Sequence, residues 1–281
     1  MAASGRKVAL VTGASAGIGL YTALGLARGG YHVILAGRDL KRTTRAVRLI
    51  AKRTGSEALT TALADFASLA EVRRLAETVL AEHDRLDLLV NNAGLIAPRY
   101  ALTGDGFETT LAVNHLAPFL LTNLLLERLK ASGPSRIVTV ASQAHRGARL
   151  DLGDFTQPRE WTPIKAYGRS KLANVLFTRT LACRLDGSGL FTACLHPGVV
   201  ATGIGNRPGG LVGFGWSLVK PFLISPEKGA ATSLFLAMVP DPAPFHGAYV
   251  IGKSAVDPDP AARDDDLGER LWAESARLVG V

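Results

Sequence analysis

Short apolar runs alternate with longer amphipathic segments along most of this chain. The apolar runs have the length of buried strands, and the segments between them carry the three- to four-residue repeat of helices. Seven runs predict strands, at residues 7–12, 31–36, 57–64, 86–90, 136–141, 190–195 and 247–251. Strands that alternate with helices indicate a parallel sheet covered on both faces. We therefore expect an α/β fold, with residues 1–281 forming a single doubly wound domain on a seven-stranded parallel sheet with helices on both faces.

Residues 203–224 interrupt this alternation. They are rich in Gly, Pro and large apolar side chains, among them Phe214 and Trp216. Such a mixture is typical of a mobile loop or of short amphipathic helices over a ligand. We expect a substrate lid here, and its apolar character indicates a hydrophobic ligand.

The composition excludes several classes of protein. A hydrophobic content of 47% with 20% charged residues is that of a soluble globular protein. We find no apolar run of the ~18 residues needed to span a bilayer, and no signal peptide. Cys183 and Cys194 have no metal or redox spacing, which predicts core thiols in a reducing compartment. We therefore expect a cytoplasmic protein with no membrane span and no metal site.

A net charge of +8 raises the question of a nucleic-acid partner. The basic residues are dispersed apart from one concentration, which consists of Arg38, Lys41, Arg42, Arg45, Arg48, Lys52 and Arg53. No helix-turn-helix, zinc or RNA-binding signature accompanies this charge, so we expect no nucleic-acid partner. The distal residues of the concentration, from Arg45 to Arg53, are interpreted as a solvated helix face.

A glycine-rich turn follows the first predicted strand. Glycines let the backbone approach a pyrophosphate closely, and the next helix presents free N–H groups and the positive end of its dipole. In the order strand, turn and helix, this pattern predicts a dinucleotide site. The cofactor-binding residues predicted in the turn are Gly13, Ser15, Ala16, Gly17, Ile18 and Gly19.

The end of the second strand indicates which dinucleotide binds. An acidic residue at this point binds the adenosine ribose 2′-OH, whereas an Arg accommodates a 2′-phosphate. The strand ends in Gly37-Arg38, so Arg38 favours NADP over NAD. Asp39 is interpreted as the N-cap of the following helix.

Two further strand ends are candidates for cofactor contacts. Asp65-Phe66 follows the third strand, at the carboxyl edge where ligands bind in such sheets. Asp65 either accepts a hydrogen bond from the adenine amino group or only closes a turn. The fourth strand runs into a loop of small and amide residues that suits a backbone lining for the cofactor, and its predicted contacts are Asn92, Ala93 and Gly94.

Tyr167 and Lys171 open an apolar-periodic run that predicts a helix. At positions i and i+4 they share one face of that helix. An ammonium a few ångströms away should lower the phenol pKa from its reference of about 10, which would make Tyr167 a proton donor or acceptor near neutral pH. Asn114 lies inside another apolar helix and needs buried partners, either as a structural hydrogen bonder or in a proton relay.

Together these residues resemble the short-chain dehydrogenase/reductase family. The motifs occur in the family's order and spacing over roughly residues 6–255, and they are Thr12-Gly13-x-x-x-Gly17-Ile18-Gly19, Asn91-Asn92-Ala93-Gly94, Asn114, Ser142, Tyr167-x-x-x-Lys171 and Pro197-Gly198. The chain most resembles the retinol dehydrogenase and WW-domain oxidoreductase branch, through Ala141-Ser142-Gln-Ala-His145 and His196-Pro197-Gly198-Val199. That branch usually has an N-terminal membrane anchor, and we expect none here, which favours a soluble relative.

The resemblance implies a Rossmann-type domain with Asn114, Ser142, Tyr167 and Lys171 as catalytic residues. Ser142 would polarise a substrate carbonyl and Tyr167 would give it a proton, while Lys171 would hold the nicotinamide ribose and Asn114 would anchor a water. Cofactor contacts implied by the resemblance are Tyr167, Lys171, Pro197, Gly198, Val200 and Thr202. Relatives often pair through the Tyr167 helix and others are monomers, so a homodimer and a monomer both stay open.

We predict an NADP(H)-dependent oxidoreductase that interconverts a ketone or aldehyde and an alcohol on a hydrophobic small molecule, acting as a carbonyl reductase or ketoreductase. A protein of a different class on the same fold would be an NADP sensor without turnover. The acid–base residues favour the enzyme, because a sensor has no use for an acid directed at a carbonyl.

Overall fold

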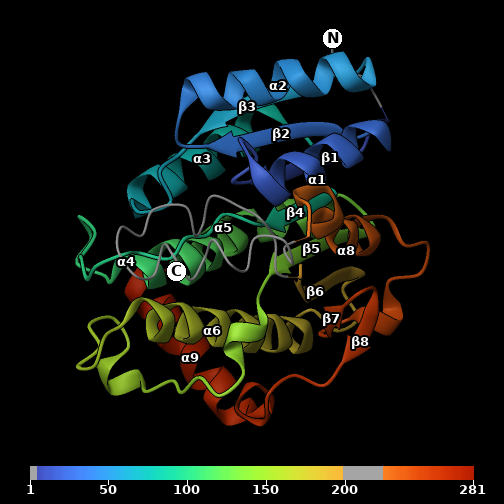
Figure 1. Ribbon diagram of the computed structural model, residues 1–281. Helices are drawn as coiled ribbons and strands as arrows, with labels where there is room; N and C mark the ends of the chain where they lie inside the picture. Colours follow the sequence, from blue (N-terminus) through green and yellow to red (C-terminus); the bar gives the residue numbers. More distant parts are fainter. Residues whose placement is uncertain (1–4, 199–223) are drawn as a thin grey trace.

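The structure is a computed structural model that describes residues 5–198 and 224–281. In this part of the chain one eight-stranded sheet has the order β3-β2-β1-β4-β5-β6-β7-β8 (Figure 1). The strands are β1 (Val8–Thr12), β2 (His32–Gly37), β3 (Leu59–Leu63), β4 (Leu88–Asn91), β5 (Ser135–Val140), β6 (Leu190–His196), β7 (Tyr249–Ile251) and β8 (Ser254–Val256). The lid predicted at residues 203–224 lies outside the described residues, apart from Ile224.

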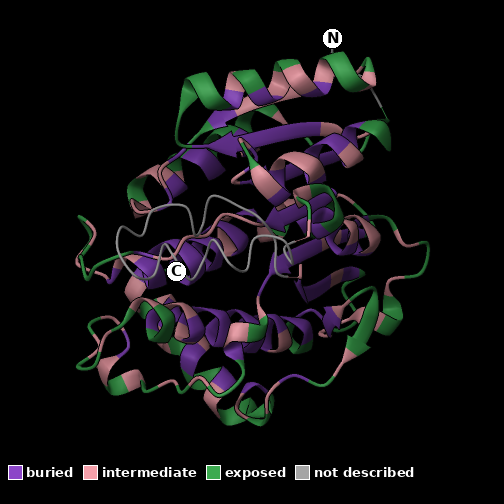
Figure 2. Ribbon diagram, in the orientation of Figure 1, coloured by how far each residue is buried: buried purple, intermediate pink, exposed green. Residues whose placement is uncertain are grey.

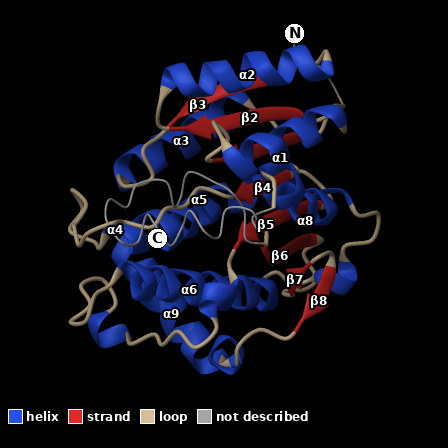
Figure 3. Cartoon of the chain, viewed as in Figure 1, coloured by secondary structure: helices blue, strands red, loops and turns tan. Residues whose placement is uncertain are grey.

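Helices cover both faces of the sheet, as predicted (Figure 3). They are α1 (Gly17–Arg28), α2 (Leu40–Thr54), α3 (Leu69–Glu82), α4 (Thr109–Leu111), α5 (Ala117–Ala131), α6 (Pro163–Arg184), α8 (Pro226–Met238) and α9 (Asp265–Val279). Side chains of α1, α2 and α8 pack on one face, and side chains of α3, α5 and α6 pack on the other. The Rossmann-type doubly wound fold expected from the sequence is confirmed.

The predicted strand count of seven is wrong by one. All seven predicted strands are present and parallel, and β8 pairs with β7 as an additional antiparallel edge strand. Two residues with positive φ, Gly252 at 55° and Lys253 at 72°, make the turn between them, a conformation that suits a tight hairpin. The sequence gives little sign of β8, because it is three residues long and its first two residues are exposed.

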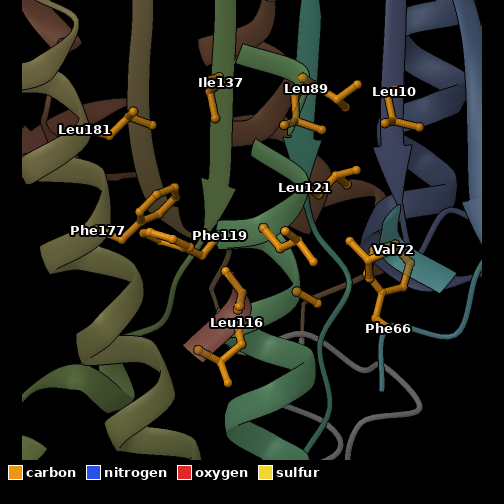
Figure 4. Close-up of a cluster of buried hydrophobic side chains, with 14 of the residues drawn as sticks. Leu10, Phe66, Val72, Leu89, Leu116, Phe119, Leu121, Ile137, Phe177 and Leu181 are labelled. Atoms are coloured by element: carbon orange, nitrogen blue, oxygen red, sulfur yellow. The ribbon is translucent and has the colours of Figure 1, made fainter. Parts of the chain in front are cut away.

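Alternation along each strand divides the core between the two faces. In β1, Leu10 packs with the α3, α5 and α6 side, whereas Ala9 and Val11 pack with α1 and α2. Figure 4 shows Leu10, Leu89 and Ile137 from three neighbouring strands facing side chains of the helices. The strands are largely buried in Figure 2. Because both faces of the sheet are covered, side chains on both sides of these strands are largely apolar, and the sequence of each strand is a continuous apolar run.

α9 covers the side of α5 and α6 that faces away from the sheet (Figure 1). Trp272 lies between the two helices, with its ring 4.9 Å from Phe119 and 5.8 Å from Phe177, and the Arg184 guanidinium lies 4.4 Å above it. His115 adds a buried polar contact, since its Nε2 lies 3.0 Å from Ser275 Oγ. Burial lowers the pKa of His115 to about 4, so this imidazole is neutral at pH 7.

One helical stretch, Thr109–Ala131, is long and apolar enough to cross a membrane by length and composition alone. This corrects the expectation that no stretch of the sequence would reach that length. Most of it is buried inside the protein, which is the position of a core helix between the sheet and α9.

Replacing Trp272 by Ala should lower the free energy of unfolding by about 3 kcal/mol, because a large aromatic contact between three helices is lost. Urea unfolding of the two proteins measures the difference. Arg270→Ala is the control on the same helix, since its ion pair with Asp266 is exposed on both sides and such pairs contribute under about 1 kcal/mol. Equal losses in both variants would contradict the anchoring role of Trp272.

Candidate active site

The site lies at the carboxyl edge of the sheet, where β1 and β4 are neighbours and the strand order reverses. Ligands bind at such a reversal in open α/β sheets, because the loops after the two strands diverge there. The loop after β1 contains Gly13 and Gly17 with φ of 66° and 59°. These left-handed conformations favour glycine over any residue with a side chain.

The glycine turn and the loop after β4 are in close contact. A Cβ atom on Gly13 would lie 3.0 Å from Ala93 Cα and from Asn92 Nδ2, and one on Gly19 would lie 2.4 Å from Asn92 Nδ2. No side chain in the described part of the chain caps α1, whose N-cap is Ala16. The turn therefore has the form of an anion cradle: close backbone and uncapped N–H groups at a helix N-terminus.

Thr12 holds this junction together, and the sequence analysis assigned it no role. Its hydroxyl donates to Val90 O at 3.2 Å and accepts the N–H groups of Asn92 and Ala93, each at 2.9 Å. Asn92 Nδ2 in turn donates to Thr12 O at 2.7 Å. A Thr directly before the first glycine of such a turn is the only signal of this role in the sequence.

The predicted 2′-phosphate residue Arg38 is exposed at the end of β2. The preceding residue, Gly37, lies beside the glycine turn, because a Cβ on Gly37 would lie 3.6 Å from Ser15 Cβ. Asp39 Oδ1 accepts the Arg42 N–H at 2.9 Å, which confirms Asp39 as the N-cap of α2. One oxygen of the Asp39 carboxylate is therefore used within α2.

Asp65 and Phe66 have structural partners of their own. Asp65 Oδ1 accepts the Ala67 N–H at 2.9 Å, as in a plain turn, and the Asp65 N–H donates to Glu71 Oε2 at 2.8 Å. Phe66 is buried in the core beside Val72 (Figure 4). The Phe66 side chain is therefore part of the core, whereas Asp65 is partly exposed.

Asn114 lies in a π-helical turn, Ala112–Leu116, between α4 and α5. It is buried, and its side chain is fully engaged: Oδ1 accepts the Leu95 N–H at 2.8 Å, and Nδ2 donates to Leu95 O at 2.9 Å and to Ser170 Oγ at 3.0 Å. The partners expected of a buried Asn are thus present. They tie the loop after β4 to α6.

Lys171 is buried on α6, and its ammonium donates to Val140 O at 2.8 Å. The ammonium is also near Asn114 and the β4 loop, because a Cβ on Gly94 would lie 3.7 Å from Lys171 Nζ and 3.3 Å from Asn114 Oδ1. Burial lowers the pKa of Lys171 to about 8. The structure therefore brings Gly94, Asn114 and Lys171 together at one point.

The pKa prediction for Tyr167 is wrong in its direction. Burial raises the pKa of Tyr167, and a hydrogen bond with Ser142 offsets only part of the rise. The Lys171 ammonium lies 5.5 Å from the centre of the Tyr167 ring and is bonded to Val140 O. Helical spacing correctly placed the two residues on one face, but it could not show where the ammonium points.

Ser142 lies beside Tyr167, at the start of a 3-10 turn, Gln143–His145. Its Oγ accepts the Ala144 N–H at 3.2 Å. Gly168, next to Tyr167, packs so closely on this turn that a Cβ there would lie 2.8 Å from Ala144 O. This close approach sets the separation of Ser142 and Tyr167, and the sequence analysis did not identify it.

The remaining predicted cofactor contacts follow β6. Gly198 has a φ of 85°, which favours glycine, and it packs closely on Ile224, since a Cβ there would lie 2.5 Å from Ile224 Cδ1. Val200 and Thr202 lie outside the described residues.

An anion cradle at the switch point, beside a buried Lys, a Tyr and a Ser, defines the class of nucleotide-dependent oxidoreductases on a Rossmann-type fold. The chain belongs to the short-chain dehydrogenase family, since residues 7–208 match the family described as short chain dehydrogenase. The family places this protein among enzymes that interconvert alcohols and carbonyl compounds with a nicotinamide cofactor.

Relatives and solved structures agree with this assignment. The chain is 44% identical to human retinol dehydrogenase 13 over 285 residues, which cover 98% of this chain and 85% of that one. An uncharacterized protein from Mycobacterium paratuberculosis has a TM-score of 0.79 at 35% identity and covers 98% of this chain and 94% of its own. L-sorbose reductase from Gluconobacter frateurii, solved with NADPH and L-sorbose, has a TM-score of 0.70 at 26% identity, with 88% and 95% covered.

Replacing Lys171 by Met should make the protein more stable at pH 7 by about 2 kcal/mol. The folded state lowers the lysine pKa from 10.5 to about 8, which disfavours the charged form by about 1.4 kcal/mol per unit; the lost hydrogen bond to Val140 O offsets about 1 kcal/mol of the gain. The free-energy cost of burying the Lys171 ammonium is fully present below pH 8 and fades as the pH rises to 10.5.

Urea unfolding at about pH 7 and about pH 10 tests this expectation, since the first value lies below the range in which the cost fades and the second lies near its upper end. The stability advantage of Lys171→Met should shrink at the higher pH. A variant that is less stable than wild type at neutral pH would show that the ammonium is not under strain.

Proposed function

We propose that this protein is an NADP(H)-dependent carbonyl reductase that interconverts a ketone or aldehyde and an alcohol on a hydrophobic small molecule. The observation that carries the proposal is the convergence of four groups beside the anion cradle. Ser142 and Tyr167 lie within hydrogen-bonding reach of each other, Lys171 lies on the same helix as Tyr167, and Asn114 lies next to Lys171.

In this proposal Ser142 and Tyr167 act on the carbonyl oxygen. The Ser142 Oγ accepts the Ala144 N–H, and its hydroxyl proton, which is directed at Tyr167, can rotate toward a substrate carbonyl. Burial raises the pKa of Tyr167, which keeps the phenol in its protonated form at neutral pH. That is the form a proton donor needs when a carbonyl is reduced.

Lys171 would hold the cofactor and exchange protons, and Asn114 would hold the backbone around it; neither would act on the substrate directly. The Lys171 ammonium lies at the cradle side of α6, where it would hold the ribose next to the reacting ring, and its pKa of about 8 allows proton exchange near neutral pH. Asn114 fixes the β4 loop through Leu95 and reaches α6 through Ser170. A bound nicotinamide would supply the hydride.

The residues at the cradle fit a dinucleotide. Gly13 and Gly19 leave no room for side chains, and the start of α1 is uncapped in the described part of the chain, as a pyrophosphate site requires. Arg38 is exposed and follows Gly37, which lies close to Ser15, and Asp39 is held as the helix N-cap. This arrangement supports NADP over NAD, and L-sorbose reductase, a structural neighbour, was solved with NADPH.

Two observations indicate the substrate class. Residues 203–224 are apolar, which supports a hydrophobic ligand, and the name of a 44% identical relative gives retinol as a substrate. An NADP sensor without turnover is the second candidate. It is favoured only by the fold, whereas the proton-bearing pair at Ser142 and Tyr167 favours an enzyme.

The packing of α9 bears on oligomeric state. A dimer that formed through the outer side of α6 would place a second copy against this side. In the structure α9 already covers it. Two ion pairs join the helices, Arg184 with Glu269 at 2.5 Å and Arg179 with Asp265 at 3.3 Å. We infer that pairing through this side would first require α9 to be displaced, which favours the monomer.

Replacing Tyr167 by Phe should reduce turnover by about 10²–10⁴-fold, the usual contribution of a positioned acid, and leave NADPH affinity within about twofold because the ring still packs. Absorbance loss of NADPH with a panel of ketones and aldehydes measures turnover, and cofactor fluorescence measures binding. A variant with more than about a tenth of wild-type turnover would refute the proton-donor role. Wild type that binds NADPH but consumes none with any carbonyl would support the sensor.

Replacing Arg38 by Asp should remove a preference for NADPH over NADH of at least about tenfold. The guanidinium can form charge-assisted hydrogen bonds worth about 1.5–3 kcal/mol with a 2′-phosphate, and about 1.4 kcal/mol is a factor of ten. The measurement is kcat/KM for both cofactors. Arg53→Asp, at the far end of α2, is the matched control and should keep the preference. If Arg38→Asp keeps it too, Lys41 or Arg42 is the selector.

A further inference from the structure

The peptide bond between Ser142 and Gln143 is held on both of its polar sides by histidine rings. On the carbonyl side, His145 Nδ1 lies 2.6 Å from Ser142 O. On the amide side, the Gln143 N–H donates to His196 Nδ1 at 3.3 Å. His145 comes from the 3-10 turn itself, whereas His196 is the last residue of β6.

The backbone partners define the tautomer of each ring. A carbonyl oxygen only accepts, so His145 Nδ1 must carry a proton, and His145 Nε2 accepts the Asp259 N–H at 3.1 Å. His196 Nδ1 accepts the Gln143 N–H, so its proton is on Nε2. Both rings are therefore neutral, and a second proton on either would face a backbone N–H.

Asp259 extends the support on the His145 side. Its carboxylate accepts the N–H groups of Gly147 at 2.9 Å and Ala261 at 3.0 Å. The Ser142 turn is thereby connected through His145 to the segment between β8 and α9. Removing either histidine would leave one polar side of the Ser142–Gln143 peptide bond without its side-chain partner.

We propose that His145 and His196, the histidine clamp, are positioning residues that direct the Ser142 hydroxyl at the substrate carbonyl. The clamp holds the peptide plane from which the Ser142 side chain extends, and neither ring needs to touch the substrate. The inference rests on the role of Ser142 in the proposed function. It also predicts the pH range in which the Ser142 hydroxyl is held in position.

The surroundings keep both rings neutral near pH 7. Burial lowers the pKa of His145; the bond to Ser142 O and the Asp259 carboxylate act in the opposite direction, and Arg146 adds to the lowering. Burial also lowers the pKa of His196, and the nearby His145 adds to it. The Tyr249 ring packs edge-on at 4.7 Å from His145, and burial raises its own pKa, so it adds no charge.

The clamp should open only in acid, below the ordinary histidine pKa of about 6.5. Protonation then replaces an acceptor by a donor at the Gln143 or Asp259 N–H, the turn loses its orientation, and kcat falls. Above that range kcat should be independent of these rings.

His196→Ala should lower kcat about ten- to hundredfold, the range associated with a small misplacement of a reacting group, with NADPH affinity within about twofold by fluorescence. His196→Asn should recover most of the kcat, because its amide oxygen can accept the Gln143 N–H without titrating. A variant with Asn at both positions should keep kcat and lose the decline at acid pH. If that decline persists, the clamp is not its cause and the proposal fails.

Combination with Ser142→Ala separates positioning from general damage. In the Ser142→Ala background, His196→Ala should have no further effect on kcat, because it acts through that hydroxyl. Losses that multiply would overturn the clamp while leaving the role of Ser142 intact. A Ser142→Ala variant with wild-type kcat would instead refute the proposed function, and the clamp with it.

His246 offers a matched control. It is also a histidine bonded to backbone, with Nδ1 3.4 Å from Thr192 N and Nε2 3.0 Å from Ala182 O, but it lies toward the opposite end of β6. His246→Ala should leave kcat and the acid decline unchanged. If His196→Ala does not fold, the two Asn variants decide the question through kcat and its pH profile.

Discussion

The close contact between the turn after β1 and the loop after β4 is the constraint on which the rest of the site depends. Thr12 fixes it by bonding one carbonyl and two N–H groups of the β4 end. Because a side chain on Gly13 or Gly19 would collide with Asn92 or Ala93, the two backbones can meet only with glycine at these positions. This contact places the start of α1 and the residues that follow β4 around one space, which a dinucleotide would fill.

The polar groups around this space carry an energetic cost that the surrounding packing offsets. The Lys171 ammonium is buried, with its pKa lowered to about 8, and Asn114 occupies a π-helical turn in the middle of an otherwise regular helix. π-Helical turns and buried charges are unfavourable in isolation and often mark functional sites. Here the apolar residues of α5, α6 and α9 hold both in place, so the stability of the core and the geometry of the site are linked.

Much of this arrangement could be predicted from the sequence, for physical reasons. Strands buried on both faces are recognisable as apolar runs, and the glycine turn, Tyr167 and Lys171 have spacings that follow from helix and turn geometry. Other features depend on tertiary contacts: His196 meets Gln143 from 53 residues away and His145 meets Asp259 from 114 residues away. The direction of the Lys171 ammonium is likewise set by Val140 O, 31 residues away, and the raised pKa of Tyr167 follows from burial in the folded protein.

The two halves of the proposed acid pair need different amounts of support because they lie on different kinds of backbone. Tyr167 and Lys171 belong to α6, a 22-residue helix that packs against the sheet, the Ser142 turn and α9, so their backbone is held by regular hydrogen bonds. Ser142 begins a three-residue turn just beyond the end of β5, where no ladder continues. Because Gly168 has no side chain, α6 can pack closely on that turn. His145 and His196 bond the two polar groups of the Ser142–Gln143 peptide bond. Side-chain contacts therefore replace secondary structure at the point where the orientation of one hydroxyl decides whether it can reach a carbonyl.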